Sequence, residues 1–187
     1  MRMNGGHMIS YGPVNLRPVE ERDLEFLRDM MNDPDIGYSV VSYGFPVSAK
    51  AQREWFEKTY PVENAYRFII EAEGRPVGTI LLGKLDKANK TGELGYKIAA
   101  AYQGKSYAYN AVCAVTRYLF EEIGIECITV NHLESNKGSR RIMEKAGYAY
   151  EGVQRSAVYK NGQRHDLVLW SCSREHYETI RKEMAGI

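Results

Sequence analysis

The sequence predicts an α/β fold in which one mixed β-sheet is flanked by helices. A strand, a helix and a second strand follow one another between residues 93 and 132, and such a unit places its two strands side by side and parallel. Alternating segments before and after this unit add antiparallel strands. With 187 residues and no repeat or low-complexity linker, the chain has room for one domain with a sizeable core. We expect that domain over residues 14–184, after a loose tail over residues 1–13.

The predicted domain begins with a short strand over residues 14–19 and a helix over residues 20–31, whose apolar residues share one face. Pro34 ends this helix, because proline disfavours a helical conformation in the residue before it. Residues 36–46 show no regular pattern, so we expect an irregular segment there. A second helix begins near Ser48, whose hydroxyl is suited to cap it.

The central elements are predicted from hydrophobic periodicity. Residues 66–73 and 76–83 form a hairpin that turns at Gly74, and residues 93–101 alternate as a further strand. The next helix covers residues 106–122, where one apolar stripe follows helical spacing: Ala108, Ala111, Val112, Val115 and Leu119. Gly124 ends it, and residues 125–132 form a strand that we expect to run parallel to 93–101.

The last third of the chain completes the sheet. A short helix over residues 136–146 is followed by Gly147, which suits a left-handed C-terminal cap. Strands over residues 148–155 and 164–171 follow, and the chain closes with a helix over residues 174–184. Pairing of these late strands across a twofold axis would make a homodimer.

Composition excludes several classes of protein. A formal charge of +1 gives no reason to expect a nucleic acid as the main partner. No apolar run reaches the roughly 18 residues of a membrane span, and the first ten residues lack the apolar core of a signal peptide. The three cysteines, Cys113, Cys127 and Cys172, form no metal-ligand spacing. We expect reduced thiols, no metal site and a cytoplasmic protein.

One stretch, "AYQGKSYAYNA" from residue 101 to 111, contains the Gly-Lys-Ser that ends a phosphate-binding P-loop. The P-loop also needs a glycine where this chain has Ala99, so a nucleoside triphosphate is not the expected ligand. A strand, a turn and a helix still follow one another here, and the free amides at such a helix start form an anion site. Small residues at Gly104, Ser106 and Ala108 allow a phosphate to approach the main chain.

Three motifs carry a resemblance to a known family. "QGKSYA" resembles the Q/R-x-x-G-x-G/A pyrophosphate loop of the GNAT superfamily of acetyl-coenzyme A-dependent N-acetyltransferases. "SNKGSRRIMEKAGYAYEGVQR" and "NGQRHDLVLWSCSREHY" are similar to two later motifs of its RimJ/RimL-like branch, which acetylates ribosomal-protein N-termini and other amines. The likeness runs from about Val14 to Tyr177, with the motifs in the family's order.

The resemblance implies a binding site for acetyl-coenzyme A. The pyrophosphate would lie on the loop formed by Gln103, Gly104, Lys105, Ser106, Tyr107 and Ala108. The parallel strands would splay apart, and the pantetheine arm would pair with the main chain of the first strand near Ile98 and Ala100. Asn136 would lie beside this arm and Arg141 would face the adenosine phosphate. A plain helix cap and a solvated basic face are the alternatives for these last two residues.

Ser106 departs from the family pattern, which has glycine at this position. Serine keeps the main-chain N–H and adds a hydroxyl, but it tolerates a left-handed backbone poorly. Two outcomes stay open at this point. A positive φ at Ser106 would weaken coenzyme binding, whereas a serine that is simply the first helical residue would cost nothing.

Acetyl transfer needs a deprotonated amine, donors for the oxyanion and a proton for the leaving thiolate. The family's usual tyrosine acid is replaced by Met143, and the resemblance assigns the role of proton donor to Ser139. No general base stands out; the candidates are Glu93, His132 and the nearby Glu134, and a water chain to solvent is the alternative.

The acceptor is predicted to be a primary amine. Residues 20–35 are acidic, and with the aromatic residues Tyr38, Tyr43 and Phe45 they suit a cationic amine, although a solvated helix explains the same charges. The leading hypothesis is direct acetylation of a protein or peptide N-terminus in a ternary complex. The alternatives are a small-amine acetyltransferase, acting on a polyamine or an aminoglycoside-like compound, and a coenzyme A-binding module without turnover.

Overall fold

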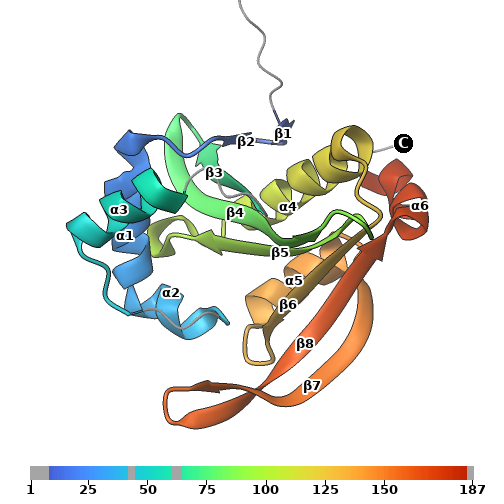
Figure 1. Ribbon diagram of the computed structural model, residues 1–187. Coiled ribbons are helices and arrows are strands. Elements are labelled where there is room, and N and C mark those ends of the chain that lie inside the picture. Colours follow the sequence, from blue (N-terminus) through green and yellow to red (C-terminus); the bar gives the residue numbers. More distant parts are fainter. Residues whose placement is uncertain (1–8, 42–44, 60–64, 185–187) are drawn as a thin grey trace, which may run out of the picture.

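The computed structural model describes residues 9–41, 45–59 and 65–184. Its centre is one mixed sheet of eight strands in the order β1-β2-β3-β4-β5-β6-β8-β7, which confirms the predicted fold class (Figure 1). The strands are β1 (Ile9–Tyr11), β2 (Val14–Arg17), β3 (Tyr66–Ala72), β4 (Arg75–Asp86), β5 (Thr91–Ile98), β6 (Cys127–Leu133), β7 (Ala149–Lys160) and β8 (Gln163–Ser173).

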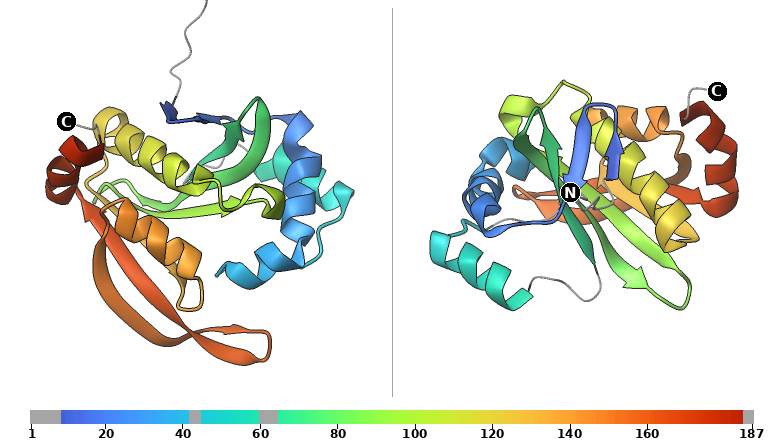
Figure 2. Two further views of the ribbon diagram at one scale, coloured as in Figure 1. Left: turned by 180° about the vertical axis from the view of Figure 1, so that it is seen from behind. Right: turned by 90° about the horizontal axis from the view of Figure 1, so that it is seen from above.

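Helices cover both faces of this sheet (Figure 2). They are α1 (Leu24–Asn32), α2 (Pro34–Ser39), α3 (Ala49–Thr59), α4 (Tyr107–Tyr118), α5 (Lys137–Lys145) and α6 (Arg174–Met184). The larger apolar core lies between the sheet and α4, α5 and α6, and the smaller one joins α1, α2 and α3 to the other face at Ile69. No helix in the described ranges is long and apolar enough to cross a membrane.

The parallel pair β5 and β6 separates part of the way along its length. The two strands are in register from Thr91↔Cys127 to Leu94↔Val130, and their pairing stops there. Beyond that point β5 stays paired with β4 as far as Ile98, while β6 stays paired with β8 as far as Leu133. Each strand therefore follows its own antiparallel neighbour, and a gap opens in the middle of the sheet. The predicted parallel pair and its splay are confirmed, although β5 ends at Ile98 rather than at residue 101.

Helix α4 lies beside this gap because its apolar stripe is buried against the sheet. Ala111, Val112, Val115 and Leu119 are completely buried, as the spacing predicts. The helix widens into a π-turn over Leu119–Ile123 and ends at Gly124, whose φ of 78° lies in the left-handed region.

Three segments differ from the sequence predictions. The predicted tail is wrong for Ile9–Tyr11, which forms β1 and pairs with β2 after a turn at Gly12. Residues 36–46 were expected to be irregular, but Pro34–Ser39 form α2. Asp33 caps this helix, and Pro34 suits its first turn. The hairpin of β7 and β8 extends to the turn at Asn161–Gly162, where both residues have the positive φ typical of a tight hairpin. Tyr43 lies outside the described residues.

Candidate active site

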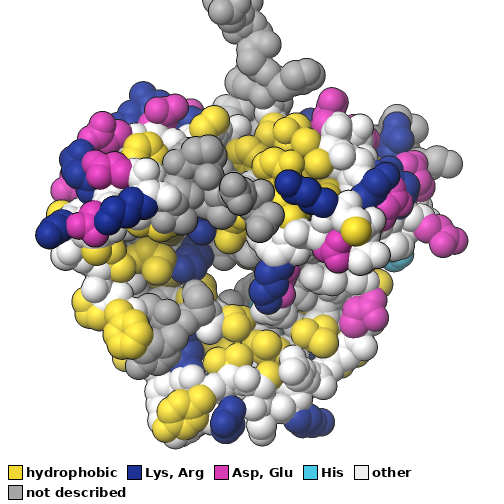
Figure 3. All heavy atoms as spheres, viewed as in Figure 1, with side chains coloured by type: hydrophobic (Ala, Val, Ile, Leu, Met, Phe, Trp, Pro, Cys, Tyr) yellow, Lys and Arg dark blue, Asp and Glu magenta, His cyan; other side chains and the backbone are white. Residues whose placement is uncertain are grey.

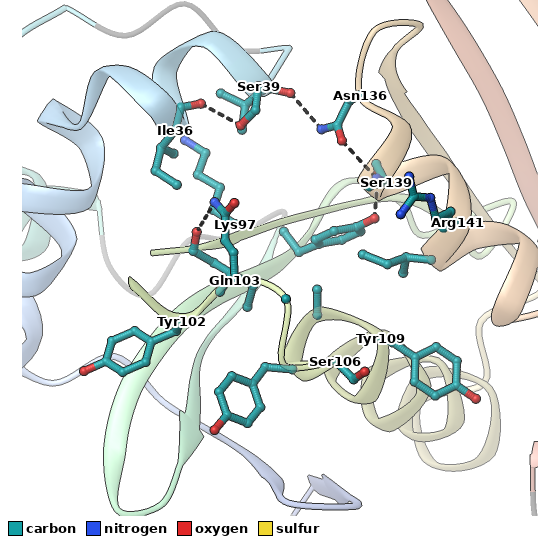
Figure 4. A pocket seen from close by; sticks show the side chains of 18 of the residues that line it. Ile36, Ser39, Lys97, Tyr102, Gln103, Ser106, Tyr109, Asn136, Ser139 and Arg141 are labelled. Atoms are coloured by element: carbon teal, nitrogen blue, oxygen red, sulfur yellow. Dashed lines mark hydrogen bonds between the residues drawn. The ribbon is translucent and has the colours of Figure 1, made fainter. Parts of the chain in front are cut away.

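The gap between β5 and β6 leads into a cavity of about 400 Å³ (Figure 4). Its walls come from the end of β5, the loop before α4, the first turns of α4 and α5, and α2. The structure brings most of the predicted site residues to it: Ile98, Gln103, Gly104, Ser106, Tyr107, Ala108, Asn136, Ser139 and Arg141. Because α2 and α4 lie on opposite faces of the sheet, the cavity connects both faces through the gap.

The loop before α4 is held against the end of β5. A short 3₁₀ turn follows the strand, and the side-chain amide of Gln103 donates a hydrogen bond to the carbonyl of Ile98 at 3.1 Å. Gly104 has a φ of 78°, which turns the chain towards the helix. The first amides of α4 have no partner within the helix, so with the helix dipole they suit an anion at the cavity wall.

Ser106 is the N-cap of α4 and has φ 62° and ψ 9°, a left-handed conformation. This decides between the two outcomes left open by the sequence: the position does require a positive φ. A residue with a Cβ atom is strained in this region by about 1–2 kcal/mol. Serine therefore keeps the loop geometry at a cost that glycine would avoid.

The main chain of β5 faces the gap at Ile98. The amide of the next residue, Ala99, donates to Val77 of β4 at 3.0 Å. Main-chain groups of successive strand residues point to opposite sides, so those of Ile98 point into the gap, as a pantetheine partner requires. Ala100 differs from the prediction, because it follows the strand and its carbonyl accepts from the amide of Gln103 in the 3₁₀ turn. It does not line the cavity.

Helix α5 presents two predicted residues in its first turn. The side-chain oxygen of Asn136 accepts from the amide of Ser139 at 2.9 Å, so Asn136 is an N-cap as well as a cavity residue. Its side-chain nitrogen donates to the carbonyl of Ser39 at 2.9 Å, which ties α5 to α2 across the cavity. Ser139 is 8% exposed and points towards the gap (Figure 4).

Tyr96, which no sequence motif pointed to, lies beside Ser139. Their hydroxyl oxygens are 2.6 Å apart. Burial raises the pKa of Tyr96 to about 12, so its phenol keeps its proton at neutral pH. The alternation of β5 places Tyr96 on one face with Leu94 and Ile98, which favoured a role in the core. The one sequence signal for a role in the site was that a buried tyrosine hydroxyl needs a polar partner.

His132 is not placed for the base role predicted from its sequence position. It is 3% exposed and lies outside the cavity. The indole of Trp170 donates to Nε2 at 3.0 Å, so Nδ1 carries the proton and donates to the carbonyl of Leu133 at 2.8 Å. Burial lowers the pKa of His132. Both nitrogens of a neutral ring are engaged, and this position is structural.

Glu93 is not placed for catalysis either. It lies where β5 is still paired with β6, before the gap opens, and its carboxylate accepts from Lys84 at 2.9 Å. Lys105 is exposed, with its ammonium 5.9 Å from the ring centre of Tyr102, and it does not line the cavity. Within the described ranges, no group of three His, Cys, Asp or Glu side chains could hold a metal ion.

The geometry fits the coenzyme that the motifs imply: a helix start for phosphates, an open strand edge for an amide-bearing arm and hydroxyls at the gap. The family model of the acetyltransferase (GNAT) domain matches residues 14–149. The chain belongs to this family. It is a GNAT N-acetyltransferase that uses acetyl-coenzyme A as its acetyl donor and an amine as its acceptor. This membership replaces the alternative of a coenzyme-binding module without turnover.

GNAT relatives with different acceptors resemble this chain. It is 29% identical over 171 residues to the Bacillus subtilis protein named "Putative ribosomal N-acetyltransferase YdaF", covering 88% of this chain and 93% of the relative. It is 25% identical over 173 residues to the spermidine N(1)-acetyltransferase of Escherichia coli (strain K12), covering 91% of each.

Solved GNAT structures show the same fold. Spermidine N-acetyltransferase from Vibrio cholerae, in complex with CoA and spermine, has a TM-score of 0.83 at 21% identity, covering 89% of this chain and 98% of that one. RimL, the ribosomal L7/L12 alpha-N-protein acetyltransferase, in complex with coenzyme A, has a TM-score of 0.82 at 17% identity with the same coverage.

Proposed function

We propose that this protein acetylates the amino terminus of a peptide or protein, and that the amine attacks acetyl-coenzyme A directly in a ternary complex. The observation that carries this proposal is the continuity of the cavity through the sheet. A coenzyme on the α4 side and an acceptor on the α2 side meet at the gap between β5 and β6. Holding both reactants there removes much of the entropic barrier to a bimolecular reaction.

The residues at the gap match the needs of the reaction. The amine nitrogen forms a bond to the thioester carbon, and the carbon–sulfur bond then breaks. The hydroxyl pair of Ser139 and Tyr96 provides a proton for the departing thiolate. The main chain of Ile98 provides a donor for the oxyanion, and the loop before α4 with Arg141 holds the coenzyme's phosphates.

The positions of Glu93 and His132, two of the predicted bases, favour the amino terminus of a peptide as the acceptor. Glu93 and His132 are held by other partners outside the cavity, so we expect the amine to lose its proton to water. An α-amino group has a pKa of about 7.7–8.0, whereas an alkyl amine such as that of lysine has a pKa of about 10.4. Without a positioned base, an amine that is already partly neutral is the better nucleophile.

A small amine is the second candidate, because spermidine acetyltransferases are among the relatives and share the fold. An acceptor panel separates the two. Thiol release from acetyl-coenzyme A would be measured with an N-terminal ribosomal-protein peptide, the same peptide with a blocked amino terminus, spermidine and an aminoglycoside. We expect turnover of the free peptide alone; faster turnover of spermidine would overturn the proposal. Initial rates at varied concentrations of both substrates should intersect, as a ternary complex requires.

The oligomeric state is part of the same proposal. Strand β7 is at the edge of the sheet, and it exposes Tyr150 and Tyr159. We propose that this edge pairs with a second copy in a homodimer; light scattering should give twice the chain mass. A monomer at assay concentration would contradict it.

A further inference from the structure

Lys97 is a cavity residue that the motifs do not assign to any role. It precedes Ile98 on β5, so its side chain points to the face of the sheet opposite Tyr96 and Ile98. It lines the cavity on the side of α2, together with Ile36, Ser39 and Val40 (Figure 4). Lys97 therefore faces the space through which an acceptor reaches the gap.

Among the described residues, the charged side chains that line the cavity are all cationic: Lys97, Arg141 and Lys145. Arg141 and Lys145 project from α5 on the side of α4, and the ammonium of Lys145 lies 4.1 Å from the ring centre of Tyr109. On this side they suit the coenzyme's phosphates. In the described part of the chain, Lys97 is the charged side chain that lines the cavity on the side of α2.

The acidic segment over residues 20–35 contributes no residue to the lining of the cavity. Asp23 and Glu21 pair with Arg17 and Arg53, and Asp29 pairs with Arg28. Figure 3 shows acidic and basic side chains interspersed over α1 and α3, and basic ones bordering the hollow in the centre of the face. The carboxylates of Glu21, Asp23 and Asp29 are therefore paired with arginines, and none of the seven carboxylates of this segment lines the cavity.

The surroundings of Lys97 lack a matching anion within the described ranges. Its ammonium donates to the sulfur of Met31 at 3.2 Å, and a thioether is a weak acceptor. Burial lowers the pKa of Lys97, and the nearby positive charges of Arg67 and Lys160 lower it further. The side chain of Lys97 is partly buried, and removing an ammonium from water is costly unless an anion accompanies it.

We propose that Lys97 selects acceptors that carry a carboxylate a few bonds from the reacting amine, as a peptide with an acidic residue next to its amino terminus does. This inference rests on the proposed function and narrows its acceptor class. The carboxylate pairs with the ammonium of Lys97 at the mouth of the gap, and this fixes the neighbouring amine for attack. A polyamine would instead bring further positive charge to Lys97.

Matched peptides test the proposal. Two peptides differ only by Glu or Gln at the second position, and thiol release is measured with each. We expect the Glu peptide to have a kcat/KM at least about tenfold higher. Lys97→Gln should bring this ratio close to one, and Lys97→Glu should reverse it. Lys87→Gln, the same change at an exposed lysine outside the cavity, should leave the ratio and the activity unchanged.

Other outcomes decide against the proposal. Equal rates for the two peptides, or a ratio that survives Lys97→Gln, would overturn the role of Lys97 while the peptide acetyltransferase stands. Free glutamate turned over faster than the Glu peptide would keep the carboxylate contact but overturn the peptide as its source.

A binding measurement separates this inference from the proposed function. If neither peptide is turned over, the proposed function fails. The role of Lys97 is then tested by calorimetry, which measures the binding of each peptide to the protein saturated with coenzyme A. Binding of the Glu peptide at least about tenfold tighter than the Gln peptide supports the contact with Lys97. Equal binding of the two peptides overturns it.

Discussion

The hydroxyl oxygens of Tyr96 and Ser139 lie 2.6 Å apart, from a strand and a helix that are far apart in the sequence. Tyr96 comes from the part of β5 that has left β6, and Ser139 from the first turn of α5. Both residues line the cavity at the gap, which is why we propose this pair as the proton donor to the leaving thiolate.

Removal of the Ser139 hydroxyl should slow the chemical step. Ser139→Ala is expected to lower kcat at least about tenfold while coenzyme A still binds. The helix cap should survive, because Asn136 binds the main-chain amide of Ser139 rather than its side chain. Steady-state kinetics and calorimetry measure the two effects, with Ser135→Ala, an exposed neighbour, as the control. An unchanged kcat would exclude Ser139 as the proton donor, and Tyr96→Phe would then test its partner.

Glycine at position 106 should relieve backbone strain. The left-handed φ of Ser106 destabilises the folded protein because serine has a Cβ atom. Glycine removes this strain, but it increases the entropy of the unfolded chain, which offsets part of the gain. The net gain for Ser106→Gly is about 0.5–1 kcal/mol, or a Tm higher by about 2 °C. Ser106→Ala keeps the Cβ atom and should show no gain. Thermal melts of both variants measure this, and equal Tm values for the two would contradict the strain.

Arg141 should contribute to coenzyme binding through a phosphate. Arg141→Gln is expected to weaken coenzyme A binding about tenfold, since a charge-assisted contact at the cavity wall is lost. Lys137→Gln, at an exposed position of the same helix outside the cavity, should change it little. The loss should disappear when coenzyme A is replaced by its form without the 3′-phosphate. A loss that persists there would assign Arg141 to the pyrophosphate instead.

His132 should make the free energy of unfolding depend on pH below neutrality. Its pKa is lowered in the folded protein below the ordinary value of 6.5, so the unfolded chain binds the proton more readily. The contribution of His132 is present above about pH 6.5 and is lost as the pH falls through the folded-state pKa. Chemical denaturation between pH 5 and 7.5 should show this slope, and His132→Asn should flatten it. If both proteins show the same slope, the pH dependence comes from carboxylates and not from His132.

The sequence by itself determined the order of the elements and the coenzyme side of the site. The stripe on α4, the Gly124 stop and the loop from Gln103 to Ala108 are local features, because helix spacing and turn chemistry act over a few residues. For the same reason the N-cap role of Asn136 was predictable. In the predicted tail over residues 1–13, strand β1 was missed, since its three residues carry too little pattern.

Only the tertiary structure decided the chemistry around the gap. The register of β5 with two different neighbours sets where the sheet opens, and this leaves Glu93 on the closed side and brings Tyr96 to Ser139. The fold also brings Lys97 to the cavity wall on the side of α2, while no carboxylate of residues 20–35 lines that wall. Such contacts depend on how strands diverge and side chains pack in three dimensions, and residue spacing along one chain does not encode them locally.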